Sequence, residues 1–196
     1  MEILSYFSLV PLVALSMAGH FEIGVISALA LSLTFAVVAS KSGNLKTMDI
    51  VFPIFFTVCG ITLLLPIAGT LEEYVGSLLW GVLATMALTS LVIGRPFTLQ
   101  HAKRRTIEAV WDTPPFIAVN YLLTWIFAVV FTVNTVVSAI WGFHNLAVHV
   151  ICFGLLFTAI ASTAVLPKYY LPYYIRKRAA RSTPKDLNTL PPKPVS

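Results

Sequence analysis

Six apolar runs separated by short polar segments fill most of this 196-residue chain. A helix needs about 20 mostly apolar residues to cross the hydrocarbon core of a bilayer, and the runs approach or reach that length. The pattern predicts an all-α polytopic membrane protein with six transmembrane helices. The runs are Ile3–Ala18, Ile23–Ser40, Ile50–Ala68, Ser77–Ile93, Phe116–Trp141 and Leu146–Leu166.

The composition agrees with a membrane protein. Hydrophobic residues make up 58% of the chain and charged residues 11%, whereas an ordinary soluble domain is about 25% charged. Once the runs are subtracted, no large domain outside the membrane can form. We expect one transmembrane domain over residues 1–181 and a proline-rich cytoplasmic tail over residues 182–196, which has little to bury and is expected to be disordered.

The first run, Ile3–Ala18, has an alternative reading as a signal peptide. Signal peptides begin with a cationic segment, and no Lys or Arg precedes Lys41. We therefore expect this run to be a helix of the mature protein.

All 13 Lys and Arg residues fall in alternate segments between the runs. They occupy the segment Lys41–Lys46, the segment Arg95–Arg105 and the stretch that begins at Lys168, while the segments between these contain none. With six spans, the cationic segments share one side of the bilayer. The positive-inside rule places that side, and both termini, in the cytoplasm.

The same partition divides the runs into three helical hairpins. The second helix of each hairpin carries small residues four positions apart, which share one helix face and let helix backbones approach closely in lipid. We predict that these faces line the interior of the bundle while the bulkier first helices face lipid; the alternative is that small residues are common in any membrane helix. The stripes are Gly24, Ala28, Ser32, Ala36 and Ser40, then Ser77, Gly81, Thr85 and Thr89, then Gly154, Thr158 and Ser162.

The cationic segment between the fourth and fifth runs predicts a short helix over residues 97–111 that lies in the cytoplasmic interface. Its cations would contact anionic lipid headgroups, with Trp111 at headgroup level. Because the cations adjoin apolar runs, the net charge of +5 indicates lipid contact and topology, and no nucleic acid partner is expected. The expected lipid- or partner-contacting residues are Arg95, Lys103, Arg104, Arg105, Trp111, Arg176, Lys177 and Arg178.

Few polar side chains lie inside the runs, and each is a functional candidate because polar groups in a membrane are costly. Asn120 and Asn134 are 14 residues apart and so share a face of the fifth helix. They either bind a substrate or hydrogen-bond neighbouring helices. The first alternative predicts an intramembrane polar seam formed by Asn120, Asn134, Thr85, Thr89, Thr158 and Ser162, with Ser32 beside them.

Catalytic and metal chemistry is not indicated. His20, His144 and His149 fall on the outer side with nearby glutamates, but their spacing does not require them to converge on a metal. Cys59 and Cys152 sit inside apolar runs and are expected to be buried small hydrophobes. We expect no catalytic residue, no metal and no cofactor.

Several short stretches resemble the intracellular septation protein A family of bacterial inner-membrane proteins. They are Leu91-Val92-Ile93-Gly94-Arg95-Pro96, Ala109-Val110-Trp111, the residues Asn120, Trp125 and Asn134, and Gly60-Ile61-Thr62-Leu63-Leu64. The segment Thr70–Tyr74 departs from the family, which has lysine and tryptophan there, and so does the proline-rich tail. The resemblance implies a multi-pass protein of the bacterial inner membrane that acts in envelope maintenance or division.

Two functions follow from these observations. The first is a non-enzymatic membrane scaffold that acts through helix packing and through other membrane or division proteins at its cytoplasmic face. The alternative is a small transporter or channel that uses the polar seam. Since six helices are few to enclose a wide pathway, this alternative predicts a homo-oligomer. A membrane-embedded enzyme that uses the acidic and histidine side chains of the outer face is the third hypothesis.

Overall fold

The computed structural model describes residues 7–43, 45–103, 106–142 and 145–179, with side chains described as far as Tyr170. Within these ranges the regular structure is helical, with no strand. The elements are α1 (Leu9–Met17), α2 (Phe21–Lys41), α3 (Thr47–Thr62), α4 (Ala68–Val92), α5 (Phe97–Lys103), the 3₁₀ helix η2 (Glu108–Val110), α6 (Pro114–Trp141) and α7 (Leu146–Ala179).

Four helices are long and apolar enough to cross a bilayer: α2, α4, α6 and the first 25 residues of α7. The other two predicted spans are shorter. α3 has 16 residues and α1 has 9, so at 1.5 Å per residue they extend about 24 Å and about 14 Å, against a hydrocarbon core of about 30 Å. The all-helical prediction is confirmed over the described residues, while six complete crossings stay a prediction.

Two helix boundaries differ from the prediction. α3 ends at Thr62, and α4 begins at Ala68, nine residues before the predicted start at Ser77. The predicted loop Thr70–Tyr74 is therefore helical. Leu71 and Val75 lie one turn apart and are both buried. The buried face of α4 therefore includes the turn that contains Glu72 and Glu73.

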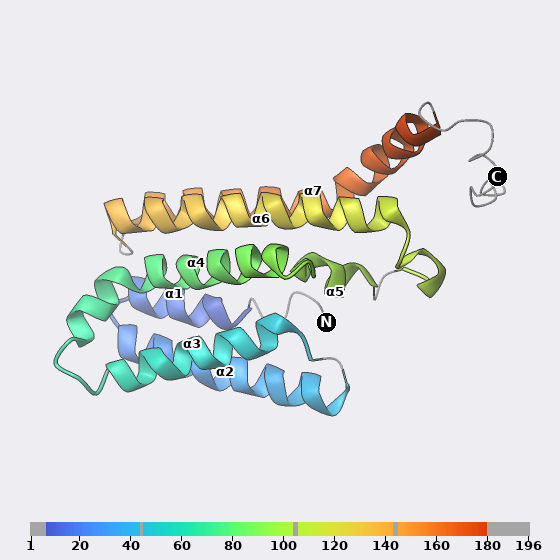
Figure 1. The fold of residues 1–196 in the computed structure, drawn as a ribbon. Coiled ribbons are helices and arrows are strands. Elements are labelled where there is room, and N and C mark those ends of the chain that lie inside the picture. Colours follow the sequence, from blue (N-terminus) through green and yellow to red (C-terminus); the bar gives the residue numbers. More distant parts are fainter. Residues whose placement is uncertain (1–6, 44, 104–105, 143–144, 180–196) are drawn as a thin grey trace.

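The last helix also extends beyond its predicted end at Leu166, to Ala179. Pro167 lies in this extension and cannot donate a backbone hydrogen bond, and the end of α7 bends away from α6 (Figure 1). The predicted tail, residues 182–196, lies outside the described residues.

Successive long helices run in opposite directions, so that the described cations gather at one end of the molecule (Figure 1). This cationic end contains the α2–α3 connection with Lys41 and Lys46, the α4–α6 connection with Arg95 and Lys103, and the C-terminal part of α7. The α1–α2, α3–α4 and α6–α7 connections lie at the opposite end. The chain order of the cations thus places them at one end of the long axis, where Asp49, Glu108 and Asp112 also lie.

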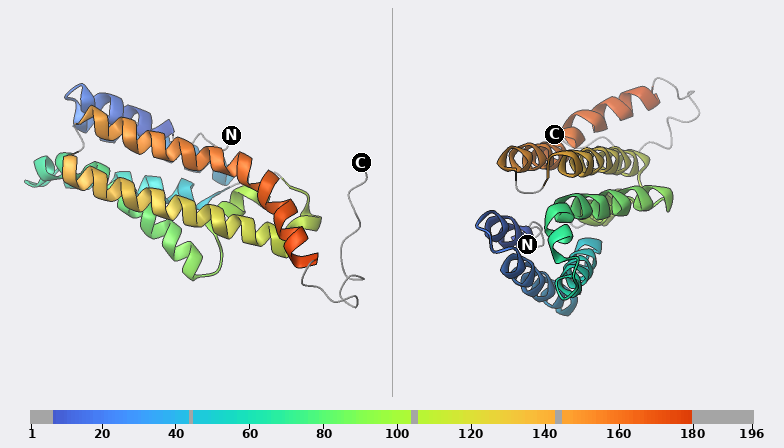
Figure 2. Two further views of the ribbon diagram at one scale, coloured as in Figure 1. Left: turned by 90° about the horizontal axis from the view of Figure 1, so that it is seen from above. Right: turned by 90° about the vertical axis from the view of Figure 1, so that its left-hand side faces the viewer.

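The helices form two groups (Figures 1 and 2). In one group α2 packs against both α1 and α3, and in the other α6 packs against both α4 and α7. α3 and α4 touch far less than α4 and α6 do. The middle predicted hairpin is therefore not a tightly packed pair, although the first and third are.

Aromatic side chains hold the second group together. The Trp80 ring of α4 stacks on Phe131 of α6 at a centroid distance of 6.0 Å and meets the edge of Phe153 of α7 at 6.1 Å. Phe127 lies 5.7 Å from Phe131 and 5.5 Å from Phe97 of α5. Ring contacts of this kind add to the dispersion that drives helix association in lipid.

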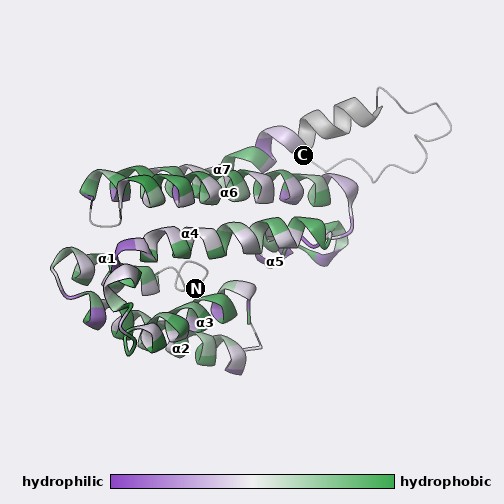
Figure 3. Cartoon of the chain, turned by 60° about the vertical axis from the view of Figure 1, so that its left-hand side comes forward, coloured by the Kyte–Doolittle hydropathy of each residue, from purple (hydrophilic) through white to green (hydrophobic). Residues whose placement is uncertain are grey.

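The prediction that small-residue stripes line the bundle holds only in α2, where Gly24, Ala28 and Ser32 are buried. It is wrong for α4 and α7. Thr85 and Thr89 are exposed, as are Gly154 and Thr158. The bulky residues of α4, α6 and α7 pack instead, because large side chains make more dispersion contacts. Apolar residues predominate along the helices (Figure 3), and many large ones are exposed while others are buried, so hydropathy does not mark the packed face.

Candidate functional site

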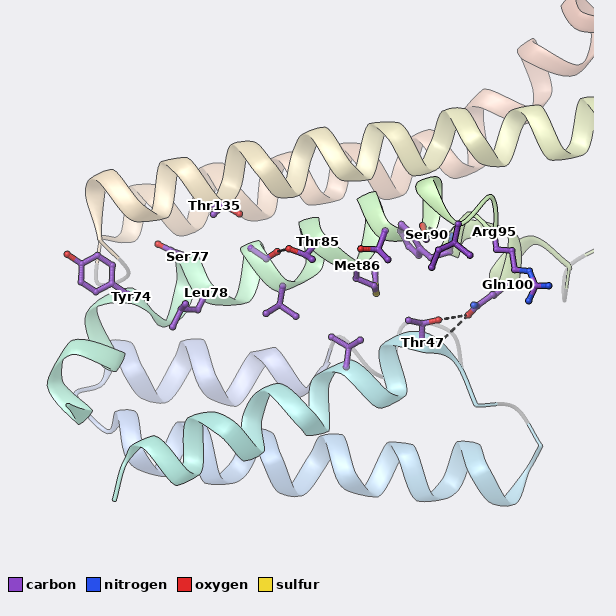
Figure 4. A pocket seen from close by; sticks show the side chains of 16 residues that line it. Thr47, Tyr74, Ser77, Leu78, Thr85, Met86, Ser90, Arg95, Gln100 and Thr135 are labelled. Atoms are coloured by element: carbon purple, nitrogen blue, oxygen red, sulfur yellow. Dashed lines mark hydrogen bonds between the residues drawn. The ribbon is translucent and has the colours of Figure 1, made fainter. Parts of the chain in front are cut away.

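A cavity of about 1010 Å³ lies beside α4 on the side of α3 (Figure 4). Most of its lining comes from one face of α4 between Tyr74 and Ile93, and the first turns of α3, α5 and Thr135 of α6 complete it. We call it the α4 groove. It exists because α4 turns its bulky face to α6 and packs little against α3.

The small-residue stripe of α4 lies in this groove. Ser77, Gly81, Thr85 and Thr89 all line it. The Thr85 hydroxyl donates to the Gly81 carbonyl oxygen of the same helix at 2.8 Å, which satisfies the hydroxyl without a partner across the groove. Between these residues the walls are apolar, with Leu78, Val82 and Met86.

The groove has a polar, cationic end formed by Arg95, Gln100 and Thr47 (Figure 4). The Gln100 side-chain oxygen accepts from the Thr47 hydroxyl at 3.1 Å and from the Thr47 backbone N–H at 3.4 Å. These bonds join α3 to α5 across 53 residues of sequence. A smaller cavity of about 410 Å³ adjoins them, lined by Lys46, Thr47 and Gln100 among others.

A tight turn after α4 sets the position of Arg95. Gly94 has φ of +77°, a conformation that glycine adopts without steric cost. The Arg95 N–H donates to the Ser90 carbonyl oxygen at 3.0 Å, and the Phe97 N–H donates to the Ser90 hydroxyl at 3.2 Å. The Arg95 side chain is exposed and has no hydrogen bond or ion pair to a described residue.

The predicted interfacial residues separate into two places. Arg95 lies in the groove, whereas Lys103 and Trp111 meet outside it, with the lysine Nζ 5.1 Å from the indole centroid. The indole N–H donates to the Thr106 carbonyl oxygen at 3.2 Å. Arg104 and Arg105 lie outside the described residues. Arg176, Lys177 and Arg178 belong to the last turns of α7, and their side chains also lie outside the description.

The single interfacial helix predicted over residues 97–111 is wrong in extent. The described part contains α5, which ends at Lys103, and the separate turn η2. α5 is tied to the bundle through Phe97 and Thr98, which are both buried. The Thr98 hydroxyl donates to the Asn120 carbonyl oxygen of α6 at 2.8 Å and shares a hydrogen bond with Thr124.

Asn120 and Asn134 are both buried in α6, but their side chains make different contacts. The Asn120 amide donates to the Phe116 carbonyl oxygen of its own helix at 2.9 Å. The Asn134 amide donates to the Cys152 carbonyl oxygen of α7 at 3.1 Å. The side-chain oxygens of both residues are buried without a hydrogen-bond partner among the described residues. Asn134 therefore joins two helices directly.

The remaining seam candidates are spread over three surfaces. Thr85 and Thr89 line the α4 groove, Thr158 is exposed on α7, and Ser162 is half-buried on α7. Ser32 is buried in α2 and donates to the Leu29 carbonyl oxygen. The structure does not bring the six residues together in one lining. It does place Thr47 and Gln100 beside Arg95, a group that no sequence spacing indicates.

The part of the chain that is described contains no group of three or more His, Cys, Asp or Glu side chains placed to hold a metal ion. The His149 ring lies 6.4 Å from that of Phe153, in a stacked arrangement, and its Nδ1 is 3.1 Å from the Asn145 carbonyl oxygen. His144 lies outside the described residues. Cys59 and Cys152 are free thiols and are buried, as the sequence indicated.

Replacing Asn134 with leucine is expected to lower the stability of the protein by about 1 kcal/mol, the usual size of an interhelical hydrogen bond in a membrane. Asn120→Leu is the matched control, because the Asn120 side chain bonds only its own helix. Unfolding by a denaturing detergent in mixed micelles measures both. Equal losses for the two variants would contradict a specific α6–α7 role for Asn134.

Comparison of the chain with protein-family models, with curated proteins and with solved structures found no significant match.

Proposed function

We propose that this protein is a multi-pass protein of the bacterial inner membrane, with both termini in the cytoplasm, that acts as a non-enzymatic scaffold in envelope maintenance or division. The observation that carries the scaffold role is the use of buried polar groups. Asn134 joins α6 to α7, and Thr98 joins α5 to α6. Both therefore strengthen the packing of a rigid bundle rather than line the α4 groove.

The distribution of charge supports the proposed orientation of the protein in the membrane. The described Lys and Arg residues lie at one end of the molecule (Figure 1), while Glu22, Glu72 and Glu73 lie at the other. A cationic end is retained in the cytoplasm during insertion. The role in the envelope is supported by the resemblance of Leu91–Pro96 and Ala109–Trp111 to the septation protein A family.

Co-purification from native membranes in mild detergent tests the scaffold. Mass spectrometry is expected to find stoichiometric membrane or division proteins with the wild type. Lys103→Glu is expected to lower their recovery at least about fivefold, since reversing a charge at an interface costs about 1 kcal/mol or more. Glu73→Lys, an equal reversal at the opposite end, is the control. Recovery of the chain without stoichiometric partners would contradict the scaffold.

A small oligomeric transporter is the second candidate, and the α4 groove is the observation that favours it. Ser77, Thr85, Thr89 and Thr135 give the groove a row of hydroxyls. For this candidate, Thr85→Leu combined with Thr89→Leu is expected to abolish flux in proteoliposomes, while leaving partner recovery unchanged. Flux that survives the double substitution would exclude the groove as a pathway.

A further inference from the structure

The α4 groove joins two kinds of surface that one ligand class would match. At the cationic end, the Arg95 guanidinium is exposed with no hydrogen bond or ion pair to a described residue. Beside it, the Gln100 side-chain oxygen is held by Thr47, which fixes the carboxamide and leaves its NH₂ group as a donor. A planar guanidinium with an adjacent amide donor is suited to a phosphate group.

The rest of the groove is suited to hydrocarbon. Val51 of α3 and Val82, Met86 and Ile93 of α4 are among its apolar lining residues, and the Thr85 hydroxyl is satisfied within its own helix. From Thr85 to the end of α4 at Val92 the helix rises about 11 Å, and the Gly94 turn then leads to Arg95. The hydrocarbon of one leaflet is about 15 Å thick. An acyl chain of one leaflet would cover that distance.

We propose that the α4 groove binds one anionic phospholipid of the cytoplasmic leaflet, with its phosphate at Arg95 and Gln100 and an acyl chain along α4 toward Thr85. This inference rests on the membrane placement proposed above. It assigns Arg95, which the sequence grouped with the general interfacial cations, to a specific headgroup contact. The bound lipid fills the space between the two helix groups that the α3–α4 packing leaves open.

Lipid retention by the full chain tests the site. The purified protein in detergent is titrated with phosphatidylglycerol and, separately, with phosphatidylcholine of the same acyl chains, and bound lipid is counted by native mass spectrometry. We expect one retained phosphatidylglycerol, bound about tenfold more tightly than phosphatidylcholine. Both lipids present a phosphate, but phosphatidylcholine adds a choline cation that the Arg95 guanidinium repels, and a repulsion of about 1.4 kcal/mol corresponds to a tenfold preference. Arg95→Gln is expected to remove that preference.

Two matched controls separate the site from general effects. Lys41→Gln removes one positive charge at the same end of the molecule, from a residue that does not line the groove. Thr85→Phe fills the groove and is expected to lower retention of both lipids. Thr158→Phe is the control for Thr85→Phe. Thr158 lies on α7, is also exposed, and its hydroxyl also donates to the carbonyl oxygen of a glycine four residues earlier, Gly154, at 2.9 Å. Lys41→Gln and Thr158→Phe are both expected to retain phosphatidylglycerol as the wild type does.

Three outcomes overturn the inference: equal retention of the two lipids, equal effects of Lys41→Gln and Arg95→Gln, or a dimer that Thr85→Phe dissociates while lipid retention is unchanged. The last would mean that a second copy covers the groove. Cysteine labelling of sealed vesicles is done in parallel. A chain that does not cross the membrane contradicts the proposed function, whereas the expected topology without selective lipid retention contradicts only the lipid site.

Discussion

Phe131→Ala is expected to lower the stability of the bundle by about 2–3 kcal/mol, more than the loss expected for Asn134→Leu. Phe131 is 0% exposed in the middle of α6, with Trp80 of α4 stacked on it at 6.0 Å and Phe127 at 5.7 Å. Truncation leaves a cavity where α4 and α6 meet.

The expected loss is below that for a buried phenylalanine in a soluble protein, which is about 3–5 kcal/mol. In a bilayer the exposed side chain meets lipid rather than water, so much of the transfer term disappears and the lost packing remains. Phe157→Ala on α7 is the control, because that ring is 68% exposed. Unfolding by a denaturing detergent compares the two. A loss for Phe157→Ala as large as that for Phe131→Ala would contradict the packed arrangement of α4, α6 and α7.

Gly24→Val is expected to separate α1 from α2 and to cost about 1–3 kcal/mol, the usual range for an overpacked contact. A Cβ at Gly24 would lie 3.2 Å from the Leu12 carbonyl oxygen, 3.3 Å from the Pro11 carbonyl oxygen and 3.4 Å from the Leu12 Cα. All three are backbone atoms, so no side-chain rotation relieves the contact. α1 must move as a whole, and with 9 residues it has few other contacts to hold it.

Gly154→Val is the matched control for this substitution. A Cβ at Gly154 meets nothing within 4 Å, so the stability of that variant is expected to stay within about 0.5 kcal/mol of the wild type. Hydrogen exchange measured by mass spectrometry locates the effect. Faster exchange in α1 is expected for Gly24→Val, with α6 and α7 unchanged. Unchanged exchange in α1 would show that the α1–α2 contact is looser than the structure has it.

The contacts within each helix group are more extensive than those between the two groups. Asn134 joins α6 to α7, and the ring contacts of Trp80 join α4 to both of them. α3 is joined to this group by a few contacts with α4 and by the Thr47–Gln100 bonds at the cationic end.

The sequence predicted the features that depend on hydropathy and charge alone. The bounds of α2 and α6 lie within two residues of the predicted runs, and the described cations lie at one end. An unpaired backbone group is costly in hydrocarbon, so each apolar segment forms a helix. A charge is costly there too, so the cations stay at the helix ends. Both requirements apply to each segment on its own. The location of the cations at one end could therefore be predicted without knowledge of any tertiary contact.

The face that each helix packs was decided only in the tertiary structure. Ser77, Gly81, Thr85 and Thr89 were expected to meet another helix, yet they line a groove while Trp80 and its apolar neighbours are buried. The groups at Thr47, Arg95 and Gln100 likewise meet only in the fold. In a soluble protein, polarity distinguishes the outer face of a helix from the inner one. In a membrane both faces are apolar, so the fit between side-chain shapes selects the packed face, and that fit cannot be read from one helix alone.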